Sequence, residues 1–565
     1  MTPHPGDWID RPRDDRGIAF VRRHGRDRWT YARLATLVHG EVARLQGHGI
    51  GPGDVVALGV PAGPAFLAAL HAAWRIGAAV APLPAVPVAS RSSAVARLAG
   101  MLSAVRPKAV YVTDHSRSLL EDAMAMADPG AGPLLVLADR PEPGRAPVTA
   151  GERAGGETAL LQFSSGTTGQ PRAAELTHDN LASNVAAIRG WLKPSDADVA
   201  AIWLPPFHDM GLVGCLLLPV SAQVELTIMQ PYDFVRRPLD WLRCFGLEGA
   251  TLTATPAFTM RILLRQRDRM ERGALAGWDF SAWRTWILGA ERIDARLLGE
   301  VAEWLAPHGF DPATFAPAYG LAETTLAVTG TPMAVPPTIL DVDRRSFRRG
   351  APVDVRRVVG DASPRLPGDL ATESVVGSGV PMPDTRVLIV DEDGAALPEG
   401  RVGEIAVAGP GVSQGYRTAV GFEPHAATAS PACDGTLRTG DLGFVVGGEL
   451  FVLSRLADWI LTDGGGIGLE ALEATLACLP GQARPPFALV RERDSPQRLV
   501  LLVEGGDEPW ERSAADHLRT VLGADVDLAV VAVTPGTIER TTSGKIRRTS
   551  IAAGLELDAA PRPAG

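Results

Sequence analysis

The chain has 565 residues, of which 46% are hydrophobic, and a formal net charge of −10. This length exceeds that of one typical core, so two or more domains are expected, and the acidic balance argues against a dedicated nucleic-acid-binding protein. The four cysteines are scattered without a CxxC pair, which favours reduced thiols in a cytoplasmic protein over a disulfide framework or a zinc site.

Helix-like and strand-like segments alternate through the N-terminal part of the chain. Helical periodicity covers residues 29–46, 64–76 and 93–105, and strand-like apolar runs cover residues 55–60, 78–83 and 109–113. This alternation predicts a layered α/β fold with a substantial parallel component. The polar, Pro-rich start of the chain does not resemble a signal peptide. The longest apolar region, residues 66–89, contains His71, Arg75 and prolines, so no membrane span is predicted.

The rest of the chain has a different pattern. Residues 129–157 are rich in Pro, Gly and Ala and predict a surface connection, and a second α/β region spans residues 199–318. Short apolar runs at 387–407 predict antiparallel strands with tight turns, and residues 450–453 predict another strand. After Asp458 a smaller unit follows, with a helix at 469–479 and strands near 488–490 and 499–503. The expected fold class is α/β, with a small β-rich subdomain and a small C-terminal α+β domain.

A loop of Ser, Thr and Gly follows the strand-like run at 159–163. Its residues are Ser164, Ser165, Gly166, Thr167, Thr168 and Gly169. Glycines let the backbone approach a ligand, and the hydroxyls add donors, an arrangement that suits phosphates such as those of ATP. The loop is not a Walker A loop, because no Gly-Lys-Ser/Thr sequence closes it. The alternative is an ordinary turn between the strand and a helix at 179–192.

Four further motifs follow this loop in the chain. They are Tyr319-Gly-Leu-Ala-Glu323, Arg438-Thr-Gly-Asp441, Ser454-Arg-Leu-Ala-Asp458 and Thr542-Ser-Gly-Lys545. With the loop, they resemble the core motifs of the adenylate-forming superfamily, which includes acyl-CoA synthetases, adenylation domains of peptide synthetases and luciferases. The resemblance covers nearly the whole chain, from Trp29 to Lys545. It implies an N-terminal adenylation domain (residues 1–454), a mobile C-terminal domain (455–565) that pivots at Asp458, and ATP and Mg²⁺ as cofactors.

The resemblance also implies roles for individual residues. The cofactor-binding residues would be the loop residues, Gly289, Ala290, Glu291, Tyr319, Gly320, Asp441 and Arg455. Tyr319 would stack on adenine, and Asp441 would accept the ribose hydroxyls. Glu323 and Thr167 would be the metal ligands, since hard oxygen ligands suit Mg²⁺. Lys545 would reach the substrate carboxylate and the α-phosphate; a solvated basic segment is the alternative.

A histidine-containing segment indicates a branch of the superfamily. The sequence Trp203-Leu-Pro-Pro-Phe-His-Asp-Met-Gly-Leu212 resembles the HDMGL motif of fatty acyl-AMP ligases, which pass the acyl group to an acyl carrier protein instead of CoA. The long segment at about 330–376 resembles the insertion that restrains domain rotation in that branch. His208 is therefore expected, with Lys545 and Glu323, in the catalytic set, as an acyl-pocket or gate residue. A packed core histidine is the alternative.

Two loops depart from the family pattern. Arg172-Ala-Ala174 stands where Lys-Gly and a β-branched residue are usual, and Thr462-Asp-Gly-Gly-Gly-Ile-Gly468 replaces a loop that normally carries Arg, Asn and a Tyr-Pro pair. The consecutive glycines are expected to increase loop freedom.

Three functions therefore stay open. The first is a fatty acyl-AMP ligase that activates a fatty acid and loads the phosphopantetheine thiol of an acyl carrier protein, in natural-product or lipid biosynthesis. The second is a ligase for another carboxylic acid or for CoA. The third is an inactive homologue that binds nucleotide or acyl ligand.

Overall fold

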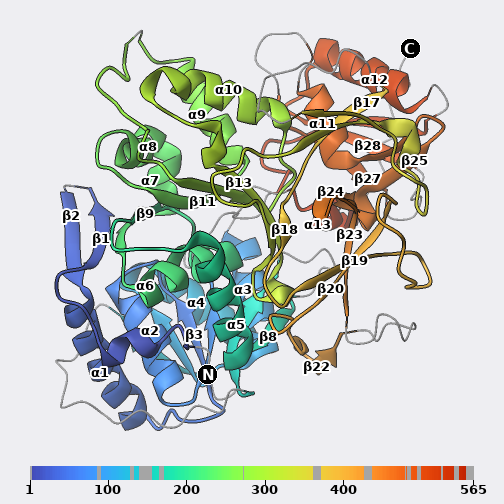
Figure 1. Cartoon of the computed structure of the whole chain (residues 1–565). Helices are drawn as coiled ribbons and strands as arrows, with labels where there is room; N and C mark the ends of the chain where they lie inside the picture. The colour runs from blue at the N-terminus through green and yellow to red at the C-terminus, as the bar shows by residue number, and fades with distance from the viewer. Residues whose placement is uncertain are drawn as a thin grey trace.

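Two large sheets form the frame of the N-terminal part of the molecule, and the C-terminal elements lie to one side of it (Figure 1). The computed structural model describes residues 3–23, 25–84, 91–127, 133–138, 156–164, 171–271, 273–359, 371–425, 436–477, 479, 485–492, 498–523, 526–539 and 546–554.

The first sheet has eight strands among these residues. In spatial order they are β22 (Gly421–Pro424), β21 (Gly415–Thr418), β8 (Ala173–Thr177), β7 (Thr158–Phe163), β4 (Ala79–Pro82), β3 (Val55–Gly59), β5 (Ala109–Val112) and β6 (Leu134–Leu137). The helices that connect its parallel strands are α2 (Pro64–Arg75), α3 (Arg91–Val105) and α4 (Asp114–Ala127). β3 pairs in parallel with β4 and β5, so the predicted α/β alternation is confirmed here.

The second sheet has nine strands among the described residues. In spatial order they are β18 (Val380–Pro381), β14 (Ala327–Gly330), β13 (Phe315–Gly320), β12 (Thr285–Gly289), β11 (Leu252–Pro256), β9 (Val199–Ile202), β10 (Glu225–Ile228), β1 (Gly17–Arg22) and β2 (Gly25–Thr30). The helices that adjoin these strands in the sequence are α1 (Tyr31–Gly47), α5 (His178–Leu192), the π-helix η2 (Met210–Leu217), α6 (Leu218–Ala222), α7 (Pro231–Arg236), α8 (Pro238–Gly246), α9 (Phe258–Arg267) and α10 (Ala295–Leu305).

The helices that pack between the two sheets contribute to one continuous core. Trp74 of α2, Leu181 of α5, Leu212 of η2 and Trp286 of β12 belong to the same buried cluster. The indole of Trp74 donates a 2.8 Å hydrogen bond to the carbonyl of Ala159, so its polar edge is satisfied inside this core. The core therefore includes residues of both large sheets, such as Leu160 of β7 and Leu288 of β12.

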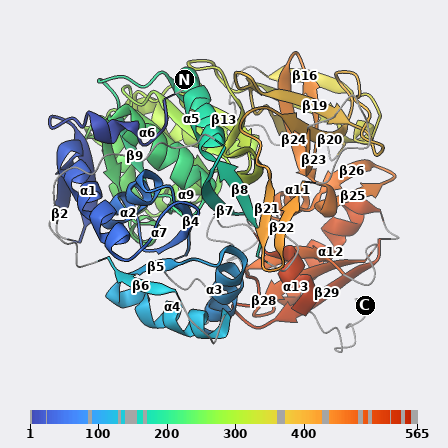
Figure 2. The same ribbon diagram turned by 90° about the horizontal axis from the view of Figure 1, so that it is seen from below.

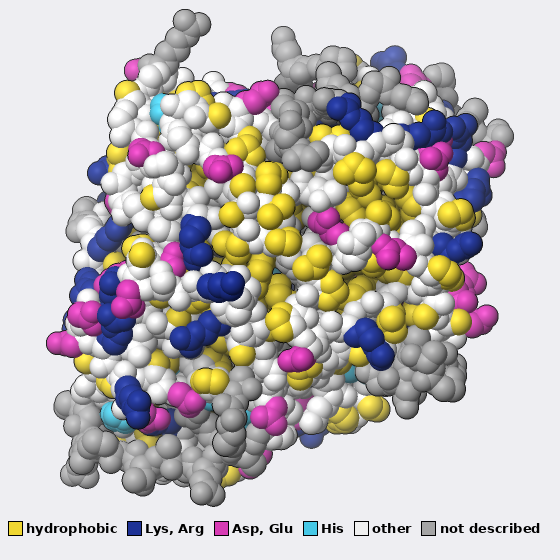
Figure 3. Space-filling model, viewed as in Figure 1, with side chains coloured by type: hydrophobic (Ala, Val, Ile, Leu, Met, Phe, Trp, Pro, Cys, Tyr) yellow, Lys and Arg dark blue, Asp and Glu magenta, His cyan; other side chains and the backbone are white. Residues whose placement is uncertain are grey.

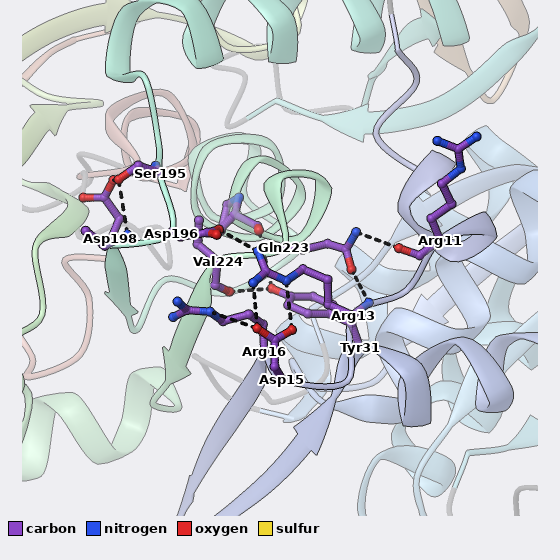
Figure 4. Close-up of polar contacts among 12 residues, drawn as sticks. Arg11, Arg13, Asp15, Arg16, Tyr31, Ser195, Asp196, Asp198, Gln223 and Val224 are labelled. Atoms are coloured by element: carbon purple, nitrogen blue, oxygen red, sulfur yellow. Dashed lines mark hydrogen bonds and ion pairs between the residues drawn. The ribbon is translucent and has the colours of Figure 1, made fainter.

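Polar contacts link the segments that flank β1 and β2 to the chain just before β9 and β10 (Figure 4). Arg13 forms ion pairs with Asp15 at 2.7 Å and Asp196 at 2.6 Å. Gln223, just after α6, accepts a 2.7 Å hydrogen bond from the backbone amide of Arg13. The hydroxyl of Tyr31 donates to the carbonyl of Val224 at 2.7 Å. These contacts accompany the parallel pairing of β1 with β10, far along the chain.

Smaller sheets follow. Four antiparallel strands form a β-rich layer: β19 (Arg386–Val390), β20 (Gly403–Ala408), β23 (Leu437–Val446) and β24 (Glu449–Arg455). The antiparallel pairing of β19 with β20 confirms the prediction for residues 387–407. The predicted insertion carries a separate three-stranded sheet of β15 (Ile339–Asp343), β16 (Val355–Val359) and β17 (Thr372–Val376), with a 3-10 turn, η6 (Arg344–Ser346), after β15.

The C-terminal elements have buried clusters of their own. They are the hairpin β25 (Trp459–Thr462) and β26 (Gly465–Gly468), α11 (Leu469–Leu476), β27 (Phe487–Arg491), β28 (Leu499–Glu504), α12 (Glu508–Leu522), β29 (Leu528–Val533) and α13 (Arg548–Gly554). Leu472, Leu489, Leu501 and Leu518 pack together in one of these clusters. Among the described residues, no helix is both long and apolar enough to cross a membrane.

The structure corrects two local expectations. The helix expected at residues 179–192 is confirmed as α5, but the Ser/Thr/Gly loop leads first into β8, which pairs antiparallel with β7. A helix N-terminus therefore cannot supply phosphate-binding amides directly after the loop; α5 begins only at His178, where Thr177 and Asn180 form a capping box. Residues 134–137 form an edge strand within the expected surface connection.

Candidate active site

Two cavities of about 240 Å³ and about 220 Å³ lie where the large sheets meet the β-rich layer and the C-terminal elements. Both are lined by Ser164, Ala290, Tyr319, Gly320 and Arg455, so they adjoin each other. The parallel strand β12 ends at Gly289, next to these cavities, and β7 ends at Phe163, which lines the first of them. Ligands in α/β folds commonly bind at such strand ends.

The first cavity brings three of the predicted nucleotide-binding residues together. The hydroxyl of Tyr319 donates a 2.7 Å hydrogen bond to Oδ2 of Asp441. Nε of Arg455 lies 3.2 Å from Oδ1 of Asp441, because β23 and β24 place the two residues opposite each other. Burial and the charge of Asp441 raise the pKa of Tyr319 well above its ordinary value, so the phenol stays a hydrogen-bond donor. The carboxylate is held by two donors and still has lone pairs for ligand hydroxyls.

Gly320 shows why the Tyr-Gly pair is needed at this strand end. A Cβ atom on Gly320 would lie 1.8 Å from the carbonyl oxygen of Leu326, so only glycine fits here. The chain turns back through a 3-10 turn, η5 (Ala322–Thr324), that carries Glu323 to the second cavity. The glycine therefore positions both Tyr319 and Glu323.

Glu323 contacts Tyr416, which in turn stacks with Arg172, and the sequence did not predict this arrangement. Oε1 of Glu323 accepts a 2.9 Å hydrogen bond from the hydroxyl of Tyr416 in β21. The guanidinium of Arg172 stacks over the ring of Tyr416, 4.3 Å from its centroid. A planar guanidinium suits such stacking, which gives a physical reason for Arg at a position where Lys is usual. No motif identifies Tyr416, since its role depends on the pairing of β21 with β8.

The segment after β12 is held by side chains from two other elements. Ala290 has a φ of +68°, which non-glycine residues rarely adopt. Oε2 of Glu291 lies 3.3 Å from Arg261 of α9, and Arg292 pairs with Glu373 of β17 at 2.7 Å. The carboxylate of Glu291 is thus engaged by α9, while Ala290 faces both cavities.

The second cavity extends into an apolar arm. The wall of this arm is formed by Ile188, Trp191, Gly214, Ala254, Ile287 and Leu326. A further cavity of about 30 Å³ shares Gly214, Ala254 and Ile287 with it, so the arm continues towards the core. His208 lines the same cavity, and its Nδ1 lies 2.7 Å from Oδ1 of Asp209. His208 is thus a cavity-lining residue and not a side chain enclosed by the core.

Several predicted residues lie outside the described residues. They are Ser165, Gly166, Thr167, Thr168, Gly169 and Lys545. Their described neighbours Ser164, Pro171, Ile546 and Arg547 all line the first cavity. Within the described part of the chain, no group of three or more His, Cys, Asp or Glu side chains forms a metal cluster. Glu323 remains a carboxylate that could contribute one ligand to a Mg²⁺ ion held mainly by phosphate oxygens.

The loop at 462–468 packs against the insertion. The amide of Gly466 donates a 2.9 Å hydrogen bond to the carbonyl of Phe347. Nη2 of Arg344 donates to the carbonyl of Val521 in α12 at 3.0 Å, and Arg348 reaches the carbonyl of Asp463 at 3.2 Å. The glycines are thus sites of close packing, and the expectation of a freer loop was wrong.

Comparison with known proteins supports this description. The family model described as AMP-binding enzyme matches residues 8–417. The protein named "Putative ligase Rv1013" of Mycobacterium tuberculosis (strain ATCC 25618 / H37Rv) is 33% identical over 527 residues. The match covers 89% of this chain and 90% of that protein. The long-chain-fatty-acid–AMP ligase FadD26 of the same strain is 29% identical over 525 residues, covering 88% of this chain and 86% of that protein.

A solved structure from a study of fatty acyl-adenylate ligases from E. coli and L. pneumophila is also similar. It has a TM-score of 0.84 and 28% identity, and the match covers 98% of this chain and 97% of that one. These similarities confirm the α/β fold class and the resemblance to the adenylate-forming superfamily and its fatty acyl-AMP ligase branch.

Proposed function

The chain belongs to the AMP-binding enzyme family, and from that premise we propose that it is a fatty acyl-AMP ligase that loads an acyl carrier protein. One observation carries this proposal: the cavity lined by the polar residues Tyr319, Asp441 and Arg455 adjoins the cavity that contains His208 and the apolar arm. A nucleotide and an acyl chain can therefore meet there end to end. The likeness to FadD26 supports a long-chain fatty acid as the acid.

The first step would join the acid to AMP. A carboxylate oxygen of the fatty acid attacks the α-phosphorus of ATP, the bond to the oxygen that bridges the β-phosphate breaks, and pyrophosphate leaves with that electron pair. Tyr319 and Asp441 would hold adenine and ribose so that the α-phosphate faces the apolar arm. Lys545 would place a cation at the carboxylate and the α-phosphate. Glu323 and Thr167 would hold Mg²⁺, which would neutralise charge on the phosphate oxygens.

The second step would transfer the acyl group. The phosphopantetheine thiol of a carrier protein, as its thiolate, attacks the acyl carbonyl, and AMP leaves. The contacts of Arg344, Phe347 and Arg348 with the C-terminal elements support a carrier protein over CoA. An insertion held against the C-terminal domain limits the rotation that would build a thiol-binding face, and a carrier protein brings its own docking surface.

The proposal is tested by two measurements on the purified protein. ATP–pyrophosphate exchange across a panel of carboxylic acids should show turnover with medium or long fatty acids. Acyl transfer to a phosphopantetheinylated carrier protein should be faster than transfer to free CoA. Exchange with a small polar acid alone, or acyl-CoA formation as fast as carrier loading, would overturn the assignment.

A further inference from the structure

The first cavity concentrates positive charge. Its arginines are Arg97, Arg172, Arg292, Arg455, Arg547 and Arg548. On the face shown in Figure 3, by contrast, lysine and arginine side chains are spread among aspartate and glutamate side chains. Such a concentration in a cavity points to an anionic ligand unless carboxylates neutralise it.

Carboxylates neutralise only part of this set. Arg292 pairs with Glu373 at 2.7 Å, Arg455 with Asp441 at 3.2 Å, and Arg548 with Glu473 at 2.8 Å. The remaining three arginines are Arg97, Arg172 and Arg547.

These three are poorly neutralised within the described residues. Arg547 has one distant partner, Glu539 at 4.0 Å. Arg172 stacks on Tyr416, and its buried Nε has no described acceptor. No ion pair or hydrogen bond to Arg97 is found in the described parts of the chain.

Arg97 lies where a polyphosphate would be expected. It belongs to α3, and Gly100, one turn further along this helix, faces Pro171 directly after the Ser/Thr/Gly loop. A Cβ on Gly100 would lie 2.9 Å from Cγ of Pro171, so glycine allows this close approach. Arg97 therefore stands beside the two ends of the loop, Ser164 and Pro171, which line the same cavity.

Arg97 and Arg547 approach each other from two different parts of the chain. α3 lies beside α13, and Arg547 directly precedes α13 (Figure 2). Burial, and to a smaller degree the nearby charge of Arg547, lower the pKa of Arg97 to about 10, while the carboxylate of Glu539 acts in the opposite direction. Glu539 acts on both arginines, and an anion bound in the cavity would further offset the repulsion between them.

We infer that Arg97 and Arg547 form, with Arg172, a binding seat for the β- and γ-phosphates of ATP and for the pyrophosphate that leaves. This inference rests on the proposed function and adds residues that none of the sequence motifs contains. An anion in the seat bridges α3 and the C-terminal segment.

Binding of inorganic pyrophosphate tests the seat without requiring turnover. Isothermal titration calorimetry should compare the full chain with Arg97→Gln, Arg97→Lys and Arg547→Gln. Arg97→Gln should weaken pyrophosphate binding about tenfold or more, which is ~1.4 kcal/mol, and Arg97→Lys should restore part of the affinity because the charge is kept. Arg91→Gln is the matched control, since Arg91 lies on the same helix, is exposed and pairs with Asp122 at 2.8 Å.

Exchange kinetics separate this inference from the proposed function. In ATP–pyrophosphate exchange, Arg97→Gln should raise KM for pyrophosphate and ATP and leave KM for the fatty acid unchanged. The double variant Arg97→Gln/Arg547→Gln should show less than the sum of the two single effects, because both cations act on one anion.

Several results would overturn the proposed phosphate-binding role of Arg97 and Arg547. Equal pyrophosphate affinity in the wild type and Arg97→Gln would do so, as would failure of the wild type to bind pyrophosphate. A raised KM for the carrier protein alone would assign Arg97 to the phosphopantetheine phosphate instead. Absence of exchange with any acid, alongside Arg97-dependent pyrophosphate binding, would remove the proposed function but not the seat.

Discussion

A Cβ atom on Gly465 would lie 1.9 Å from the carbonyl oxygen of Arg344. Gly465 has a φ of +98°, and it lies in the hairpin of β25 and β26, whereas Arg344 begins the turn η6 of the insertion. The neighbouring Gly466 is equally enclosed, since its Cβ would lie 1.9 Å from the ring of Trp459. The glycines of residues 464–466 thus let the insertion sit directly on the C-terminal hairpin.

Gly465→Ala is expected to open this contact. The substitution adds a backbone clash to the cost of a left-handed conformation, and overpacking of this kind typically costs about 1–3 kcal/mol. Hydrogen exchange should increase at residues 344–348 and 462–468, and the thermal midpoint should fall. Gly448→Ala is the matched control, because Gly448 has a φ of +77° with no atom near the Cβ position. Equal changes in hydrogen exchange and thermal midpoint in the two variants would show that the backbone clash at Gly465 does not determine the effect.

This contact illustrates what the sequence could not reveal. Consecutive glycines suggest a free loop when only neighbours in sequence are considered. The chain that encloses them, around Arg344 and Phe347, is more than a hundred residues away, and no local pattern reports that approach. The same holds for Arg97 and Tyr416, whose positions depend on how α3 and β21 pack and not on any motif.

Much of the fold was nevertheless predictable. Periodicity located the helices α2 and α3 and the strands β3 and β5 to within a few residues, because each buries a regular apolar pattern. The strand β8 was missed because its sequence, Ala-Ala-Glu-Leu-Thr, lies directly before a capped helix and has no strand periodicity of its own. The motif residues Tyr319 and Asp441 line the first cavity and Glu323 lines the adjoining second one, and their roles remain predictions.

Asp441→Asn is expected to weaken ATP binding. The amide keeps the shape but loses the charge that pairs with Arg455 and accepts from Tyr319. Hydrogen bonds to charged groups contribute about 1.5–3 kcal/mol, so KM for ATP should rise by roughly 10- to 150-fold. Tyr319→Phe is the comparison, since it removes one of the two contacts and keeps the carboxylate. An unchanged KM for ATP in Asp441→Asn would exclude a ribose-binding role.

Glu323→Gln is expected to shift the magnesium dependence of adenylate formation. Loss of the charged oxygen weakens a hard-cation ligand, so activity should fall at low Mg²⁺ and recover partly at high Mg²⁺. Tyr416→Phe is the control, because it removes the 2.9 Å hydrogen bond to Glu323 and leaves its charge. Metal titrations of exchange activity provide the measurement. If the Mg²⁺ titration curve of Glu323→Gln matches that of the wild type, Glu323 has a structural role and is not a metal ligand.

Lys545→Ala is expected to abolish most adenylate formation while ATP binding persists. A cation at the developing charge typically contributes on the order of 10²–10³ in rate. Pyrophosphate exchange measures the loss, and equilibrium binding of ATP measures what remains. Lys108→Ala is the control, since it removes an exposed lysine that pairs with Asp54 at 2.8 Å. Full exchange activity in Lys545→Ala would remove this residue from the mechanism.

Gly214→Val is expected to shorten the acyl chain that the protein accepts. Gly214 lies on η2 where the 220 Å³ and 30 Å³ cavities meet, and its Cβ would face the flexible end of Leu326 at 3.0 Å. A branched side chain there closes the passage, and each methylene that loses its apolar seat costs about 0.8 kcal/mol, roughly fourfold in kcat/KM. Long acids should therefore lose activity progressively with length, while short acids keep theirs. Gly190→Val is the control for the general cost of placing valine in a helix, because Gly190 is exposed on α5 and has open space around the Cβ position. A uniform loss at all chain lengths would place the end of the acyl site elsewhere.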